Sequence, residues 1–257
     1  MPDFTPASLH GKVVVQFGGT GLLGRALIQA LGAAGAELVV ASRNGASLEN
    51  LATRGSVRVE EVNIASEDSL HQLRDRVLER QGRIDGIVFN AVTRPMQRFG
   101  DSLEAWTTSM AVNATGFFAT VRCFGDAIAS GGRGGAIVNI ASQMGMVGMN
   151  PWLYEGTNMG APPDYFFHKG GMINLTRYLA SHYGPSGVRV NVVSPGGIYD
   201  PAQPQPAAFR ERYAKMAMLG RMAEAHEIGG AVVFLLTDAA SYITGVNLPV
   251  DGGYTAK

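Results

Sequence analysis

The sequence predicts an α/β fold of the Rossmann type, a doubly wound parallel sheet of about seven strands with helices on both faces. Three observations predict this fold. Short apolar segments alternate with longer helical segments, which is the order of a parallel sheet with crossover helices. The apolar segments contain few polar residues, as is typical of strands covered on both faces. A glycine-rich turn joins the first strand to the first helix.

The pattern of apolar residues places each element in turn. Short β-branched runs predict strands at 12–17, 37–41, 57–62, 84–90, 136–141, 188–193 and 246–250. Helical periodicity predicts helices at 22–34, around 47–53, and at 66–81, 102–111, 114–130, 165–183, 209–218 and 225–236. The stretches 148–164 and 199–206 are rich in glycine or proline and are predicted to be long loops, which often carry function. Because neither a repeat nor a linker interrupts this order, residues 1–257 are expected to form a single domain.

The composition narrows the class of protein. Lysine and arginine together number 21, and so do aspartate and glutamate, so the chain lacks the basic excess of a nucleic-acid-binding surface. No apolar run reaches the length of a membrane span, and the N-terminus lacks the pattern of a secretory signal. Cys123 is the only cysteine and falls in an apolar helical stretch, where packing is its expected role. We therefore expect a soluble, cytoplasmic protein that binds a small molecule, without a nucleic-acid or membrane partner.

The turn after the first strand predicts a phosphate-binding site. Residues 17–24 read Phe-Gly-Gly-Thr-Gly-Leu-Leu-Gly and lie between a strand and a helix. Glycine permits a close backbone approach, and the free N–H groups at a helix N-terminus attract a pyrophosphate. We therefore expect a dinucleotide to bind on Gly18, Thr20, Gly21, Leu22 and Leu23.

The end of the second strand bears on the choice of dinucleotide. An acidic side chain at this place favours NAD, because it bonds the ribose 2′-hydroxyl. Here the neutral Ser42 is followed by Arg43, whose guanidinium can pair with a 2′-phosphate. The pattern favours NADP, and NAD is the alternative if Arg43 is a solvated loop residue.

A tyrosine and a lysine open the helix at 165–183. Tyr165 and Lys169 are four residues apart and therefore share one helix face. A nearby ammonium favours the phenolate form of a tyrosine, which suits the pair to proton transfer. His168 stands between them in sequence and is expected to pack on a different face.

Polar residues follow two of the central strands. Ser142 ends the strand at 136–141, at the edge where parallel sheets bind ligands, and can stabilise a developing charge on a substrate oxygen. Asn90 ends the strand at 84–90, and Asn113 is expected to start a helix. Each asparagine can also simply satisfy backbone groups.

Together these residues carry a resemblance to a known family. The matching segments are 18–24, 89–92, 112–113, 137–142, 165–169, 194–198, 234–245 and 250–253, and they follow the family's order over nearly the whole chain. The chain resembles the short-chain dehydrogenases/reductases in their single-domain branch. The resemblance implies one dinucleotide-binding and catalytic domain, which interconverts a carbonyl and a secondary alcohol with NADP or NAD.

The resemblance also implies a role for each site residue. Tyr165 would be the acid and base, and Lys169 would bind the nicotinamide ribose and activate the tyrosine. Ser142 would orient the substrate, and Asn113 would hold a water that links Lys169 to solvent. Further contacts with the cofactor are implied for Asn63, Ile64, Asn90, Ala91, Pro195, Gly196 and Ile198.

Among the departures of the chain from the family pattern, two bear on the kind of substrate. Leu22 stands where most members of this length have glycine, and this spacing resembles that of the longer, sugar-modifying branch. The stretch between Ser142 and Tyr165 is longer than usual in the family. It is either a surface elaboration or subunit contact, or a loop that shapes the substrate site. In the second case a hydroxylated or sugar-like substrate would contact Tyr154, Glu155 and Asn158.

Other functions stay open beside this one. A 3-oxoacyl-carrier-protein reductase shares the motifs, and a sugar epimerase or dehydratase shares the glycine spacing but usually needs a longer chain. A dinucleotide-sensing regulator shares the fold but does not need the catalytic side chains. The spacing of histidines and carboxylates predicts no metal site. Relatives pair the helices at 114–130 and 165–183, which implies a homo-oligomer, either a tetramer or a dimer.

Overall fold

A parallel sheet of seven strands forms the centre of the computed structural model, which describes residues 8–44 and 57–257. Within these residues the strand order is β3-β2-β1-β4-β5-β6-β7. The strand order reverses direction between β1 and β4, and in Rossmann sheets this is the point where a ligand-binding crevice opens at the carboxyl ends of the strands. The strands are β1 (Val13–Phe17), β2 (Glu37–Ser42), β3 (Val57–Glu61), β4 (Gly86–Phe89), β5 (Gly135–Ile140), β6 (Val188–Pro195) and β7 (Asn247–Val250).

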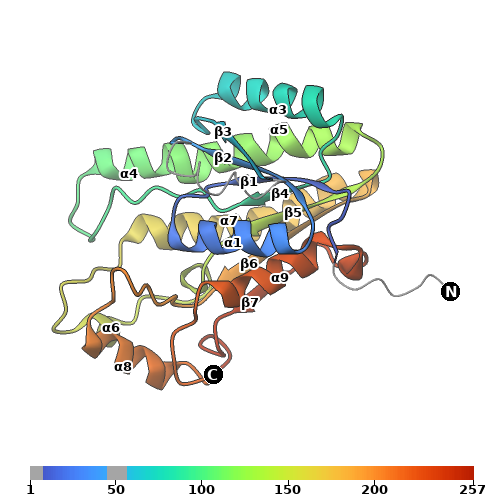
Figure 1. Ribbon diagram of the computed structural model, residues 1–257. Coiled ribbons are helices and arrows are strands. Elements are labelled where there is room, and N and C mark those ends of the chain that lie inside the picture. Colours follow the sequence, from blue (N-terminus) through green and yellow to red (C-terminus); the bar gives the residue numbers. More distant parts are fainter. Residues whose placement is uncertain (1–7, 45–56) are drawn as a thin grey trace.

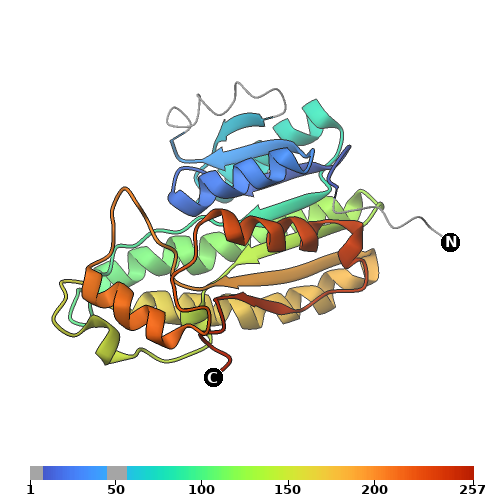
Figure 2. The ribbon, with the colours of Figure 1, turned by 60° about the horizontal axis from the view of Figure 1, so that its bottom comes forward.

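Helices cover both faces of the sheet, as predicted (Figure 1). One face packs against α3 (Glu67–Gln81), α5 (Phe117–Ser130) and α7 (Pro163–Tyr183). The other face packs against α1 (Leu22–Ala33) and α9 (His226–Leu236), which Figure 2 shows in front of the strands. The sheet therefore has a buried apolar layer on each side.

The first strand shows why the strands read as continuous apolar runs. Successive side chains of a strand point to opposite faces. Val13, Val15 and Phe17 lie in the layer with α3 and α5, and Val14 lies in the layer with α1 and α9. Because both layers are dry, every position of a central strand needs an apolar or internally hydrogen-bonded side chain.

Three further α-helices of the described residues lie beyond the sheet. They are α4 (Leu103–Met110), α6 (Pro151–Tyr154) and α8 (Ala207–Met216). The short α6 and α8 pack side by side at the end of the molecule farther from the N-terminus (Figure 1). The stretch 148–164 is therefore not wholly a loop, since it contains α6 and the start of α7, whose first helical position, Pro163, needs no N–H partner.

One other prediction of local structure was wrong. Asn113 does not start a helix, because a π-helical turn, η2 (Ala111–Gly116), joins α4 to α5 without a break. The strand β3 is an edge strand with one neighbour, and its Arg58 and Glu61 are exposed. The other described elements occur where predicted, with small shifts at their ends. The helix expected around 47–53 lies outside the described residues.

Candidate active site

The residues singled out in the sequence gather at the carboxyl edge of the sheet. The glycine turn follows β1, Asn90 follows β4, Ser142 follows β5, and residues 196–198 follow β6. Because these four strands are parallel neighbours or near neighbours, their carboxyl ends open onto the same edge. The start of α7 supplies Tyr165 and Lys169 to this region, and η3 (Gln143–Gly145), directly after Ser142, packs against α7.

The glycine turn is fixed tightly between β1 and β4. Gly18 has φ +87°, and a Cβ atom at this position would lie 2.7 Å from the Cα atom of Ala91. The amide of Asn90 donates to the Gly18 carbonyl at 2.9 Å. On the other side, Gln16 Nε2 donates to the carbonyl oxygens of Gly18 at 3.2 Å and Gly24 at 2.9 Å. These contacts hold the backbone of the turn in one conformation, and a side chain at position 18 would not fit in it.

The start of α1 fits an anionic ligand. Gly21 is the N-cap residue and no side chain caps the helix, so its first N–H groups have no capping partner. A Cβ atom on Gly21 would meet nothing within 4 Å, and Thr20 and Leu22 are exposed. An open helix N-terminus beside a glycine turn suits the pyrophosphate of a dinucleotide.

The expected adenosine side of the site lies at the ends of β2 and β3. Ser42 is buried, and Arg43 is exposed directly after it. Asn63 is exposed, and its Oδ1 accepts from the N–H of Ala65 at 3.1 Å, while Ile64 is buried beneath. Contacts of these residues with a cofactor stay predictions.

Lys169 is buried beside the ring of Tyr165. Its Nζ donates to the carbonyl of Ile140 at 2.6 Å and lies 5.6 Å from the centroid of the tyrosine ring. Burial, together with the positive charge of Arg94, lowers the pKa of Lys169 to about 7. An ammonium that exchanges its proton near neutral pH is thus placed next to the predicted proton-transfer group.

Ser142 caps the short turn η3. Its Oγ accepts from the N–H of Met144 at 3.2 Å, which leaves the hydroxyl proton to be donated elsewhere. The next residue, Gln143, accepts from the hydroxyl of Tyr213 at 3.0 Å, and the same hydroxyl accepts from the N–H of Gly197 at 2.6 Å. The buried Tyr213 of α8 therefore ties the loop after β5 to the loop after β6, a link that the sequence did not reveal.

Asn113 holds the segment that follows β4. Its Oδ1 accepts from the N–H of Thr93 and its Nδ2 donates to the Thr93 carbonyl, both at 2.9 Å. The same Nδ2 donates to Ser109 Oγ at 2.9 Å, and Ser109 donates to the buried carboxylate of Asp164. The water expected at Asn113 stays a prediction. Ser109 and Asp164 were not singled out from the sequence, although Asp164 directly precedes Tyr165.

Two further side chains surround the Tyr165 ring. The prediction that His168 packs on a different helix face from Tyr165 was wrong. The His168 ring packs edge-on against the Tyr165 ring, with 5.2 Å between the ring centroids. Burial, together with the charges of Lys169 and Arg94, lowers the pKa of His168 to about 3, and neither ring nitrogen has a hydrogen bond to the described part of the chain. The guanidinium of Arg94 lies 5.3 Å from the Tyr165 ring centroid. His168 is thus a neutral packing group, whereas Arg94 is a cation at the site that sequence reasoning missed.

The three residues expected at the substrate have different environments. The helices α6 and α8, which pack side by side, are called the cap below. Tyr154 is partly buried in this cap, with 5.6 Å between its ring centroid and that of Phe209. Burial chiefly raises the pKa of Tyr154 to about 12, so it stays protonated at neutral pH. The side chains of Glu155 and Asn158 are exposed. Their contact with a substrate stays a prediction.

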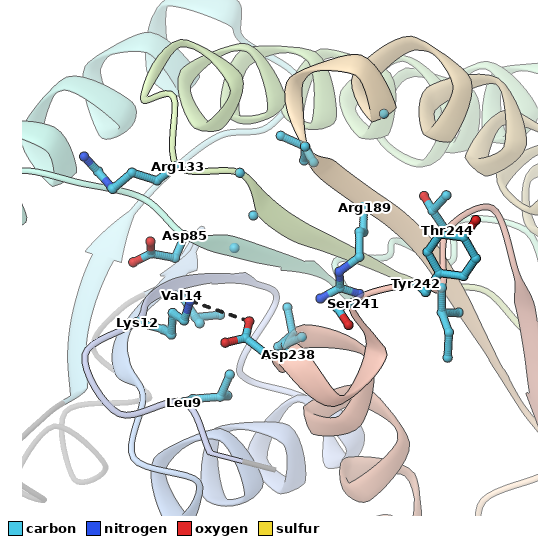
Figure 3. Close-up of a pocket in the computed structure, with 18 residues that line it drawn as sticks. Leu9, Lys12, Val14, Asp85, Arg133, Arg189, Asp238, Ser241, Tyr242 and Thr244 are labelled. Atoms are coloured by element: carbon cyan, nitrogen blue, oxygen red, sulfur yellow. Dashed lines mark ion pairs between the residues drawn. The ribbon is translucent and has the colours of Figure 1, made fainter. Parts of the chain in front are cut away.

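A cavity of about 560 Å³ lies at the opposite, amino-terminal edge of the sheet (Figure 3). Several of its charged groups have partners: Lys12 Nζ lies 3.8 Å from Asp238 Oδ1, Asp85 pairs with Arg83, and Arg189 donates to the carbonyls of Leu235 and Thr237. None of the predicted site residues lines it. In the part of the chain that the structure describes, no three His, Cys, Asp or Glu residues form a group that could hold a metal ion. No helix there is long and apolar enough to cross a membrane.

Comparisons of the sequence with known proteins agree with this geometry. A family model described as enoyl-(acyl carrier protein) reductase matches residues 21–255. A 2,5-dichloro-2,5-cyclohexadiene-1,4-diol dehydrogenase from Sphingobium indicum is 34% identical over 97% of this chain and 99% of its own. A D-threitol dehydrogenase from Mycolicibacterium smegmatis is 33% identical over 97% of this chain and 95% of its own.

Solved structures with the same fold include enzymes with nicotinamide cofactors bound. A short-chain type dehydrogenase/reductase from Mycobacterium marinum has a TM-score of 0.86 and 28% identity, over 98% of each chain. A gluconate 5-dehydrogenase from Burkholderia cenocepacia, in complex with NADP and tartrate, has a TM-score of 0.87 and 25% identity, again over 98% of each chain. A short-chain dehydrogenase from Leptospira borgpetersenii with bound NAD+ has a TM-score of 0.86 and 26% identity, over 96% of this chain and 94% of its own. The chain therefore belongs to the short-chain dehydrogenase/reductase family, and its predicted activity as an NAD(P)-dependent oxidoreductase that interconverts an alcohol and a carbonyl is confirmed.

Proposed function

We propose that this enzyme oxidises a secondary alcohol of a diol, polyol or sugar-like substrate, or reduces the matching ketone, with Tyr165 as the group that moves the proton. The observation that carries the proposal is the pair at the start of α7: the buried Lys169 has its Nζ 5.6 Å from the Tyr165 ring centroid. The pair stands at the sheet edge that also presents the uncapped N-terminus of α1.

In this mechanism the chain's own residues handle the proton and the substrate oxygen. When bound, the nicotinamide ring supplies or accepts the hydride. In reduction the Tyr165 hydroxyl donates its proton to the carbonyl oxygen, and in oxidation its phenolate accepts the proton of the alcohol. The Lys169 ammonium stabilises the phenolate, and the Ser142 hydroxyl donates to the same substrate oxygen.

The preference for NADP over NAD belongs to the same proposal. Arg43 is exposed at the end of β2, and no acidic residue stands there to bond a ribose 2′-hydroxyl. A guanidinium at this position supports a 2′-phosphate as the group that is bound. We therefore expect higher catalytic efficiency with NADP+ than with NAD+.

A hydroxylated substrate is supported by the relatives, whose names specify a cyclic diol and threitol as substrates. The cap of α6 and α8 adds polar groups near the site, including the protonated Tyr154. The test is initial-rate turnover of threitol, galactitol and cyclohexane-1,2-diol with each cofactor, with acetoacetyl-CoA reduction as the competing activity. Oxidation of at least one polyol is expected. Reduction of acetoacetyl-CoA without any polyol turnover would instead favour the acyl reductase.

We also propose that the enzyme is a cytoplasmic homotetramer or dimer. Supporting an oligomer, α5 and α7 expose large side chains on the outside of one sheet face, among them Phe118, Phe167 and Tyr178. Supporting the location, Cys123 is the single cysteine and is buried, so the fold needs no oxidising compartment. Sedimentation velocity at micromolar concentration tests the first proposal, and a stable monomer would contradict it.

A further inference from the structure

The segment that follows β4 is held at both ends. At its start, both polar groups of the Asn113 carboxamide bond the backbone of Thr93 at 2.9 Å. At its end, Asp101 Oδ2 accepts from the N–H groups of Gln97 at 2.6 Å and Arg98 at 3.1 Å. Arg94 stands between these anchors, directly after Thr93. Its backbone position is therefore set by hydrogen bonds and does not depend on its own side chain.

The guanidinium of Arg94 packs on the ring of Tyr165. It lies over the Tyr165 ring, 5.3 Å from the centroid. Its charge also reaches the groups behind the ring, because it contributes, after burial, to the lowered pKa of Lys169 and of His168. Arg94 is itself exposed, so a ligand that enters from solvent can reach its guanidinium over the Tyr165 ring.

Among the described residues, no anionic partner neutralises this guanidinium. Within residues 8–44 and 57–257, Arg94 forms no ion pair and its guanidinium donates no hydrogen bond to the protein. The carboxylate beside Tyr165 in sequence, Asp164, is buried and accepts from Ser109 instead. Two cations, Arg94 and Lys169, thus flank the proton-transfer tyrosine without a paired carboxylate between them.

We infer that the substrate carries a carboxylate in addition to the hydroxyl that reacts, and that Arg94 binds this carboxylate beside Tyr165. The guanidinium presents a planar pair of N–H donors that matches a carboxylate. A phosphate carries more charge and three acceptor oxygens, and a single guanidinium supplies donors for only part of it. The inference rests on the proposed function, since it specifies the substrate of the same site as a hydroxy acid.

The test compares D-threitol with D-threonate, which have the same four-carbon chain and differ in one end group, a hydroxymethyl or a carboxylate. Two quantities are measured on the full-length enzyme with NADP+: kcat/KM for oxidation of each compound, and the Kd of threonate by calorimetry. We expect wild type to favour threonate by at least about tenfold in kcat/KM. Arg94→Gln lowers the ratio of threonate to threitol efficiency about 10- to 100-fold and weakens threonate binding equally, the range for loss of a charged hydrogen bond.

Two variants control for effects on the fold. Arg98→Gln removes a guanidinium four residues further along the same segment. The side chain of Arg98 is 82% exposed. It should leave the ratio unchanged. Arg94→Lys keeps the charge without the planar donor pair and should recover part of the ratio. Thermal melting of each variant checks that the fold persists.

The possible outcomes separate this inference from the proposed function. Equal use of threitol and threonate by wild type, or an Arg94→Gln change that affects both compounds alike, would overturn the carboxylate site. Oxidation of threitol without turnover or binding of threonate would overturn it too, and would leave the proposed polyol oxidation standing. Threonate binding that depends on Arg94, in an enzyme that oxidises no polyol or hydroxy acid, would support the anion site and refute the proposed function.

Discussion

Lys169 should cost the folded protein stability, so replacing it should make the enzyme more stable while it destroys turnover. The lysine is buried, and its pKa falls from an ordinary 10.5 to about 7 because burial disfavours the ammonium. Lys169→Met keeps the length of the side chain and removes the charge. The variant therefore isolates the cost of holding an ammonium beside Tyr165.

The magnitude follows from the two pKa values. A drop from 10.5 to about 7 corresponds to roughly 5 kcal/mol at pH values below both. The variant also loses the hydrogen bond from Nζ to the Ile140 carbonyl, which offsets about 2 kcal/mol for a charged donor. The expected net gain is about 3 kcal/mol at pH 6, or a rise in Tm of roughly 6–12 °C for a chain of this size.

The stability gain of Lys169→Met should depend on pH. Between about pH 7 and 10.5 the unfolded chain keeps the lysine proton while the folded chain has lost it, so wild type gains stability as pH rises through this window. At pH 9 the cost of the lysine falls to about 2 kcal/mol, which the hydrogen bond roughly balances. The gain of Lys169→Met should therefore shrink toward zero.

The assay is thermal melting of wild type and Lys169→Met without cofactor at pH 6 and pH 9. The exposed Lys215 supplies the control, since Lys215→Met should change Tm little at either pH. A variant that is no more stable than wild type at pH 6, or whose gain grows with pH, would show that burial of this ammonium is not costly.

Three further predictions follow from the packing of the site. Gly18→Ala places a Cβ atom 2.7 Å from the Ala91 backbone at φ +87°, so it should lower the unfolding free energy by roughly 2 kcal/mol or more and weaken cofactor binding. The control is Gly32→Ala, where a Cβ meets nothing within 4 Å and neither effect is expected. Urea denaturation of both variants measures the difference. Tyr213→Phe leaves the Gly197 N–H and the Gln143 side-chain carbonyl without their partner, so it should lower the unfolding free energy by about 1–3 kcal/mol in the same experiment. An unchanged urea midpoint would show that the link between the two loops does not stabilise the fold. Arg43→Glu should lower kcat/KM for NADP+ at least about tenfold without lowering that for NAD+, and equal effects on both cofactors would remove Arg43 from the 2′-phosphate site.

The sheet and the glycine turn could be predicted because their signals are local. An apolar run such as β1 shows its burial in its own residues, and the turn at 18–24 shows its backbone demands in its glycines. The π-helical turn η2 was missed because its asparagine and glycine read as a break between helices, whereas packing keeps the chain helical through them.

The rest of the site depends on residues that are distant in sequence. Ser109 meets Asp164 across 55 positions, and Tyr213 meets Gln143 across 70. Neither pair has a spacing that a periodic pattern can show. Arg94 likewise looks like a loop arginine until the fold brings α7 beneath it. The sequence therefore identified the residues on which the proposed chemistry depends. The structure identified the residues that position the site by hydrogen bonds and the arginine that adds a positive charge to it.

The most direct test of the central claim is the turnover of Tyr165→Phe with a hydroxylated substrate that wild type oxidises. The substitution removes one oxygen atom and keeps the ring that packs on His168. We expect kcat to fall at least about a thousandfold, because both proton transfer and the charge on the phenolate are lost, while the Kd for the cofactor stays within about threefold of wild type. A variant that binds the cofactor and retains kcat within tenfold of wild type would contradict the account.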